Sequence, residues 1–309
     1  MALMIGDYFT EKEIGKGQYS SIYLSGKKNV TTKYIMKKYE RKQIDNSTYK
    51  EYLFNSIKIS QYFNHPNIIK IKDIKITNNH YYIIYEYCNG GNLSYILEKY
   101  QQKNVYSFHP LIVQHLMRQI VQAFIYIHKL GLIHRNITLK NIFVHFDNEQ
   151  DRANLNLMKA TVKISGLKNC IKSNKKLLTQ GIFDPNQNPS QKNDIFNLGI
   201  ICYQMIFGNN YAINNDMEQF INDIEKGKIY YPITLSKEML SFLKCMLRNN
   251  LTKILKIDEL YNHEFLKKDL RRSQPIIRPA SHTAIKNMNP LNNTSNGQCF
   301  SYNIYNNRK

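Results

Sequence analysis

A glycine-rich segment near the start of the chain has residues suited to holding a phosphate group. Gly15 and Gly17 belong to the run Gly15-Lys16-Gly17-Gln18-Tyr19-Ser20-Ser21-Ile22, and Lys37 follows further along the chain. Backbone amides in a glycine-rich turn and the ammonium group of a lysine can both contact phosphate oxygens. Such a turn recurs in unrelated proteins, so by itself it predicts a phosphate contact and does not define a class of protein.

A second group of polar residues lies in the middle of the chain. The run His134-Arg135-Asn136 is followed five residues later by Asn141. An asparagine side chain can orient a hydroxyl group, but its amide has no useful basicity near pH 7 and cannot take the hydroxyl proton. This run therefore contains no group that could serve as a carboxylate general base.

The cysteines indicate whether disulfides or metal sites are expected, and the apolar segments indicate whether a membrane span is expected. The five cysteines are scattered and form no Cys-x-x-Cys pair, which predicts neither a disulfide framework nor a zinc site and favours a reducing compartment. No apolar run reaches the length of about 18 residues that a membrane helix needs, and the first residues do not have the pattern of a signal peptide. We therefore expect no membrane span and a cytoplasmic, intracellular location.

The chain is strongly basic. It has 43 Lys and Arg residues against 23 Asp and Glu residues, a formal charge of +20, and 42% hydrophobic residues, which indicates a globular protein. The basic residues are spread along the chain and lysine greatly outnumbers arginine, as an AT-rich genome would produce. We therefore expect no dedicated nucleic-acid function, although a basic module that binds polyanions is kept as an alternative.

The pattern of elements changes along the chain from strands to helices. Residues 8–39 predict strands around a glycine turn, residues 47–63 predict a helix that ends before His65-Pro66, and two more strands follow. Long apolar helices are predicted over 111–130 and 194–208. Further expected elements are short strands over 133–144 and 160–165, and helices over 94–102, 217–227, 237–247 and 256–265.

Several motifs occur in order along this framework. They are the glycine-rich segment, Tyr34-Ile35-Met36-Lys37, His65-Pro66-Asn67-Ile68, Glu86-Tyr87-Cys88, His134-Arg135-Asn136 with Asn141, and Asp194-Ile195-Phe196-Asn197-Leu198-Gly199. In this order they resemble a eukaryotic protein kinase of the serine/threonine type. The resemblance implies an α+β, bilobal protein-kinase-like fold, with a five-stranded N-lobe that carries one long helix and a mainly helical C-lobe. The expected limits are 8–87 for the N-lobe, 88–268 for the C-lobe, and 269–309 for a disordered polar tail.

The resemblance assigns roles to individual residues. His134, Arg135 and Asp194 correspond to residues that hold the catalytic loop in place in this family. The candidates for nucleotide binding are Gly15, Gly17, Ile22, Ile35, Lys37, Glu86, Cys88, Asn141 and Phe143. Ile35 and Phe143 are larger than the usual residues above and below the adenine, so we expect a tight slot and at most weak ATP binding.

The groups that perform chemistry in the family are replaced. Asn136 stands where a kinase has its general base, and Thr138 where it has a lysine that contacts the transferred phosphate. Gly166 replaces the aspartate that binds Mg²⁺, and Ser56 replaces the glutamate that pairs with Lys37. We expect no intact catalytic residue and no Mg²⁺ site, because Asn141 alone remains as a weak candidate metal ligand.

These substitutions predict a pseudokinase, a kinase-like scaffold or allosteric partner that binds other proteins, an active kinase among them. One alternative is a weakly active, ATP-dependent atypical serine/threonine kinase in which Lys163 or Lys168 neutralises phosphate charge in place of the metal. The basic module for polyanions is the second alternative.

Overall fold

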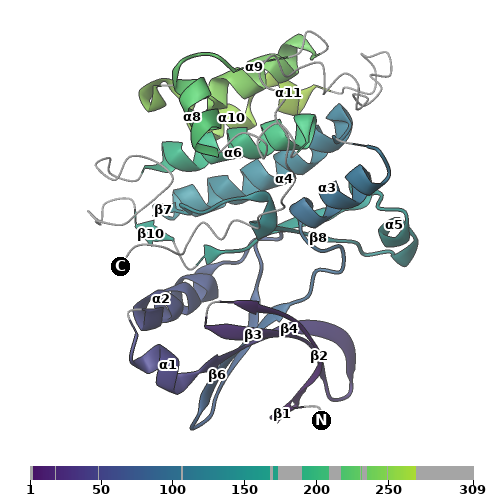
Figure 1. Ribbon diagram of the computed structural model, residues 1–309, viewed down its shortest axis with the longest axis vertical. Coiled ribbons are helices and arrows are strands. Elements are labelled where there is room, and N and C mark those ends of the chain that lie inside the picture. Colours follow the sequence, from purple (N-terminus) through teal and green to yellow (C-terminus); the bar gives the residue numbers. More distant parts are fainter. Residues whose placement is uncertain are drawn as a thin grey trace, which may run out of the picture.

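The fold is taken from a computed structural model of the chain (Figure 1). The residues it describes are 3–17, 19–47, 49–105, 107–167, 170–172, 190–208, 217–229, 231, 235–248 and 250–268. The predicted tail, 269–309, and Lys168 lie outside this set.

Within the described residues, the N-lobe is a curled antiparallel sheet of six strands in the order β1-β2-β3-β4-β6-β5. The strands are β1 (Met4–Ile5), β2 (Tyr8–Gly17), β3 (Ser20–Lys27), β4 (Val30–Glu40), β5 (Ile71–Ile76) and β6 (His80–Glu86). The five expected strands are present, and β1 is an additional one. It pairs with the start of β2 through a turn in which Gly6 has φ of 60°, and Leu3 N donates to Thr10 Oγ1 at 2.9 Å.

One long helix lies beside this sheet, as expected. The short α1 (Arg41–Asp45) leads into α2 (Tyr49–Tyr62), which ends before His65-Pro66. Leu53, Ser56 and Ser60 are buried and recur at helical spacing, so they share the face of α2 that packs on the sheet. Ser56 and Ser60 therefore place two hydroxyl groups on the buried face of α2.

The C-lobe is mainly helical. Its described helices are α3 (Leu93–Gln102), α4 (Pro110–Lys129), α5 (Glu149–Ala153), α6 (Gln191–Phe207), α8 (Met217–Glu225), α9 (Lys237–Met246), α10 (Ile257–Tyr261) and α11 (Glu264–Lys267). Two short strand pairs, β8 (Ile142–His145) with β9 (Thr161–Ile164) and β7 (Leu132–Ile133) with β10 (Ile171–Lys172), lie on the side towards the N-lobe. The apolar faces of α4 and α6 form the centre of the core.

Two of the expected elements differ from those observed. The strand expected over 133–144 is regular only at its two ends, because the backbone amides of His134 and Arg135 donate to the Asp194 carboxylate and not to a neighbouring strand. The helix expected over 256–265 is divided at Asn262, because the His263 side chain accepts from Phe265 N and starts α11.

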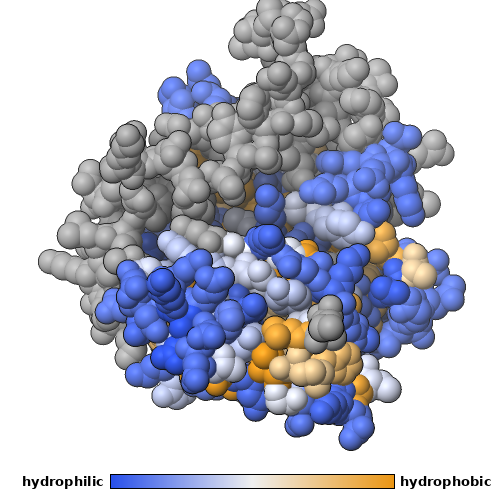
Figure 2. All heavy atoms as spheres, turned by 60° about the horizontal axis from the view of Figure 1, so that its bottom comes forward, coloured by the Kyte–Doolittle hydropathy of each residue, from blue (hydrophilic) through white to orange (hydrophobic). Residues whose placement is uncertain are grey.

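The outer end of the N-lobe is hydrophilic over most of its described surface, with one smaller apolar area (Figure 2). Within the described part of the chain, no helix combines the length and the apolar character needed to cross a bilayer.

Candidate functional site

The loop from His134 to Asn141 is held by a buried carboxylate at the start of α6. Asp194 Oδ2 accepts from His134 N and Asp194 Oδ1 from Arg135 N, each at 2.8 Å. The carboxylate is fully buried, so these hydrogen bonds offset its desolvation. Arg135 has φ of 68°, and the bonds from the two amides fix this unusual backbone.

Two histidines complete the support of this loop. His134 is fully buried, its Nε2 lies 2.9 Å from Ser165 O, and burial lowers its pKa. His128, at the end of α4, lies with Nε2 2.9 Å from Asp194 Oδ2. From the sequence, His128 was interpreted as a surface or helix histidine, because a histidine in the last turn of a helix is usually exposed. The interpretation as a surface residue is wrong, because His128 is only 6% exposed and contacts Asp194.

The loop presents amide and hydroxyl groups to the cleft. Asn136 N donates to His134 Nδ1 at 3.3 Å, and Asn136 O accepts from Asn141 Nδ2 at 2.6 Å. Thr138 is half-buried, and Thr138 O accepts from Asn141 N at 2.9 Å. The amide nitrogen of the Asn141 side chain therefore holds the loop, and the neutral amide oxygen of that side chain is left for other contacts.

Gly166 follows β9 and faces Asn141. It has φ of 87°, and a Cβ at this position would lie 3.0 Å from Asn141 Nδ2 and 3.1 Å from Asn141 Cγ. Ser165 N donates to Asn141 O at 2.8 Å, which keeps the two segments together. The residues at this place do not fit a Mg²⁺ site, because Mg²⁺ prefers several hard oxygen ligands and usually at least one carboxylate. Elsewhere in the described residues, no three His, Cys, Asp or Glu side chains gather in a way that could hold a metal.

Lys37 lies on β4. Strand register places Gly15, Ile22 and Lys37 opposite one another on three neighbouring strands. Ser56, on α2, donates its hydroxyl to Leu53 O of its own helix at 2.8 Å. Lys37 Nζ lies 5.3 Å from the centre of the Tyr85 ring, in cation–π geometry.

Tyrosines from several elements meet near Lys37. The Tyr19 and Tyr49 ring centres are 4.7 Å apart, and those of Tyr39 and Tyr49 are 6.4 Å apart. Tyr85 and Tyr81 belong to the same apolar cluster, and burial raises the pKa of Tyr39 and of Tyr85. We did not expect this cluster from the sequence, because its members come from the glycine-rich turn, β4, α2 and β6.

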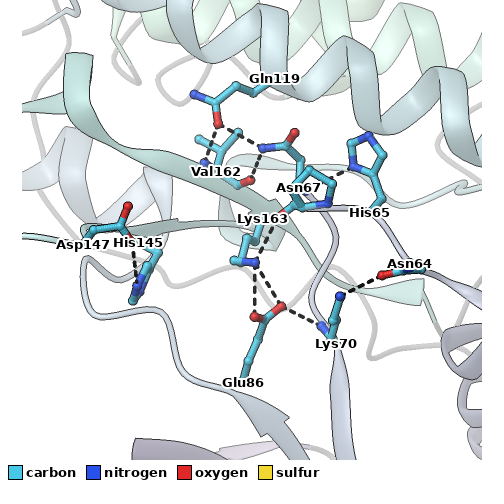
Figure 3. A network of polar contacts seen from close by, with 11 residues as sticks. Asn64, His65, Asn67, Lys70, Glu86, Gln119, His145, Asp147, Val162 and Lys163 are labelled. Carbon is cyan, nitrogen blue, oxygen red and sulfur yellow. Dashed lines mark hydrogen bonds and ion pairs between the residues drawn. The ribbon is translucent and has the colours of Figure 1, made fainter. Parts of the chain in front are cut away.

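Glu86 and Lys163 meet where the two lobes join (Figure 3). Lys163 Nζ lies 3.1 Å from Glu86 Oε2 and donates to Pro66 O at 2.9 Å, and Glu86 Oε1 accepts from Lys70 N at 2.8 Å. The Lys163 and Glu86 side chains are only 14% and 16% exposed. Lys163 therefore ties β9 to β6 and to the turn after α2, so its ammonium group is engaged away from the glycine-rich turn.

The turn after α2 is fastened to the C-lobe as well (Figure 3). Asn67 Nδ2 donates to Gln119 Oε1 at 3.0 Å and to Val162 O at 2.8 Å. Asn67 O accepts from Ile164 N at 2.8 Å. These bonds fix how the N-lobe and the floor of the cleft are placed relative to each other.

The remaining candidates lie on strands β2, β4 and β8 and just after β6. Ile35, on β4, and Phe143, on β8, are half-buried, and Phe143 is opposite Lys163 in the strand pair. Gly17 is exposed at the end of β2. Cys88 is buried after β6, and burial together with the nearby Glu86 raises the pKa of its thiol to about 12.

The fold defines a protein-kinase-like protein. It combines a curled antiparallel sheet and one long helix with a helical lobe, in which a buried aspartate holds the loop. The protein kinase domain family matches residues 8–266, so the chain belongs to the protein kinase domain family. This family implies ATP binding in general, and the fold expected from the sequence is confirmed.

Curated relatives are similar over most of the domain. A protein of Acanthamoeba polyphaga mimivirus whose name describes a serine/threonine-protein kinase is 27% identical over 72% of this chain and 54% of its own length. The serine/threonine-protein kinase ATG1c of Arabidopsis thaliana is 24% identical over 85% of this chain and 36% of its own length. A protein of Dictyostelium discoideum named "Probable myosin light chain kinase" is 24% identical over 88% of this chain and 87% of its own length. The chain thus spans about half of the first relative and about a third of the second.

Proposed function

We propose that this protein is a pseudokinase, a serine/threonine-kinase-like domain that does not transfer phosphate and acts as a scaffold or allosteric partner of other proteins. The observation that carries the proposal is the replacement of acidic groups at three separate places in the cleft. Asn136, Gly166 and Ser56 stand where a kinase has its general base, its metal ligand and the partner of its lysine.

The local geometry is consistent with the proposal. Ser56 donates its hydroxyl to its own helix, and Asn141 Nδ2 donates to the backbone oxygen of residue 136, so the Asn141 amide nitrogen is already engaged. A side chain at position 166 would meet Asn141 at about van der Waals contact or closer, since a Cβ there lies 3.0 Å away. Loss of a positioned general base alone costs roughly 10²–10⁴ in rate, before the loss of the metal is counted.

The alternative of a weakly active kinase depends on a lysine that takes the place of the metal. Lys163 is engaged by Glu86 at 3.1 Å and by Pro66 O at 2.9 Å, so this geometry does not favour that role. Lys168 lies outside the described residues.

The proposed partner is a protein, with an active kinase as the expected class, and the proposed location is the cytoplasm. Four cysteines, Cys88, Cys170, Cys202 and Cys245, are buried as free thiols, which supports a reducing compartment. The ion pair and hydrogen bonds between the lobes support a scaffold role, because they favour one arrangement of the two lobe surfaces.

A phosphotransfer assay tests the proposal. Purified protein is incubated with γ-labelled ATP, Mg²⁺ or Mn²⁺, and generic peptide substrates, and labelling of the peptide and of the protein itself is measured. We expect no labelling above that of the matched Asn136→Ala variant. Labelling by the wild type that Asn136→Ala abolishes would overturn the proposal.

A further inference from the structure

The glycine-rich turn, the start of α2 and the strand that carries Lys37 are joined by tyrosine side chains. Tyr19 lies in the turn between Gly17 and Ser20, and Tyr49 is the first residue of α2. Their ring centres are 4.7 Å apart with an interplanar angle of 38°, a direct contact between the turn and the helix.

A third tyrosine lies beside this contact. Strand register places Tyr39, on β4, opposite Ser20, and the Tyr39 ring centre is 6.4 Å from that of Tyr49. Tyr39 is only 4% exposed, so it belongs to the buried part of the N-lobe. The turn is therefore connected to α2 directly, by ring contact, and lies next to a buried tyrosine that Tyr49 also approaches.

The same cluster reaches the lysine expected to hold phosphates. Tyr85 lies in the cluster with Tyr19 and Tyr49, and Lys37 Nζ lies 5.3 Å from the Tyr85 ring centre. Strand register places Lys37 directly opposite Ile22, which in turn is opposite Gly15. The tyrosines thus lie close to both the glycine-rich turn and Lys37, the two features whose residue types suit contact with phosphates.

We propose that Tyr19 and Tyr49 form a latch that closes the glycine-rich turn onto α2 and competes with nucleotide phosphates for this end of the cleft. The inference deepens the proposed function and rests on it, because a cleft that performs no phosphotransfer need not open for nucleotide. Any nucleotide that binds must first separate the two rings, so its observed affinity is reduced by the stability of the latch.

The latch is tested by measuring the Kd of ATP in the presence of EDTA, by calorimetric titration, for wild type and Tyr19→Ala. An aromatic pair of this kind is worth a factor of about two to ten in an equilibrium constant. We therefore expect Tyr19→Ala to bind ATP about two- to tenfold more tightly, or to gain measurable binding where the wild type has none. The control is Tyr62→Ala at the other end of α2, where the residue is 72% exposed, and it should leave the Kd unchanged.

Tyr49, the other residue of the latch, allows an independent test that does not depend on a single variant. Tyr49→Leu should produce the same gain as Tyr19→Ala, and the double variant should gain no more than either single one, because all three break one contact. Additive gains, an unchanged Kd in both single variants, or weaker binding in Tyr19→Ala would overturn the latch. These outcomes leave the phosphotransfer result untouched, so failure of the latch and failure of the proposed function are distinguishable.

Discussion

Removal of the Lys163 ammonium group should destabilise the fold more than removal of an exposed cation. In Lys163→Met, the Glu86 carboxylate keeps the Lys70 amide at 2.8 Å but loses its cation at 3.1 Å. Pro66 O also loses its donor at 2.9 Å. The variant keeps the length and the apolar stem of the side chain, so the loss reports on the charge and the hydrogen bonds.

The expected loss of stability follows from the burial of the Lys163–Glu86 pair. Breaking a buried pair by removing one partner costs about 3–5 kcal/mol, whereas an exposed pair is worth about 0–1 kcal/mol. The two side chains are 14% and 16% exposed, so water still reaches them and screens part of the interaction. We expect a loss of about 2–3 kcal/mol, which lowers the Tm by about 4–12 °C for a domain of this size.

Thermal unfolding and urea unfolding at neutral pH measure this loss, with Arg152→Met as the matched control. Arg152 pairs with Glu149 three residues away, but these side chains are 41% and 71% exposed. The control should therefore lose much less stability than Lys163→Met, because water screens an exposed pair. A loss in Lys163→Met no larger than that in Arg152→Met would refute the assignment of Lys163 as a fastening between the lobes.

Three further predictions concern a glycine, a carboxylate and a thiol. Gly166→Ala and Gly131→Ala each place a side chain at positive φ, 87° and 67°, which should lower the free energy of unfolding by about 1–2 kcal/mol. Only at position 166 would the new Cβ also meet Asn141, so urea unfolding should show the larger loss for Gly166→Ala, and equal losses would contradict this. A hydrogen bond from Lys268 lowers the pKa of Glu238 from 4.5 to about 2. Since the pKa is lower in the folded state, the stabilisation is complete above about pH 4.5 and is lost as the pH falls towards 2. Glu238→Gln should therefore make the free energy of unfolding fall less steeply between about pH 4.5 and 2, as measured by urea unfolding, and an unchanged pH dependence would contradict this. Because the thiol pKa of Cys88 is raised to about 12, iodoacetamide at pH 8 should modify Cys88 only after unfolding, as read by peptide mass spectrometry; rapid labelling of the folded protein would show the burial to be wrong.

Local patterns were sufficient to predict the main elements of the fold. The helical rhythm over 47–63 and its stop at His65-Pro66 agree with α2, and the apolar runs agree with α4 and α6. The additional strand β1 was not predicted, because two residues are too few to show an alternating pattern. The order of motifs, more than any single one, predicted the family that the whole-domain comparison confirmed.

The contacts of the site were harder to predict, because they depend on residues far apart in the sequence. The sequence places Ser56 where the family has a glutamate, but it contains no sign that Tyr85 lies beside Lys37. It suggested Lys163 as a charge for phosphate, and only the tertiary structure brings Glu86 to it. Spacing within one element can be read from a sequence, whereas the first of these contacts depends on the pairing of β4 with β6 and the second on how the two lobes meet.

Asn136 and Gly166 both contact Asn141, which bears on what a single reversion can achieve. An aspartate at position 136 would regain a base, but the Asn141 side chain is bonded to the backbone of that residue and Gly166 offers no carboxylate beside it. A side chain at position 166 would have its Cβ 3.0 Å from Asn141 Nδ2, so the Asn141 amide would have to shift by a few tenths of an ångström. Under the proposed function, a reversion at position 136 or 166 alone therefore restores only part of the site, because the other position still has no carboxylate.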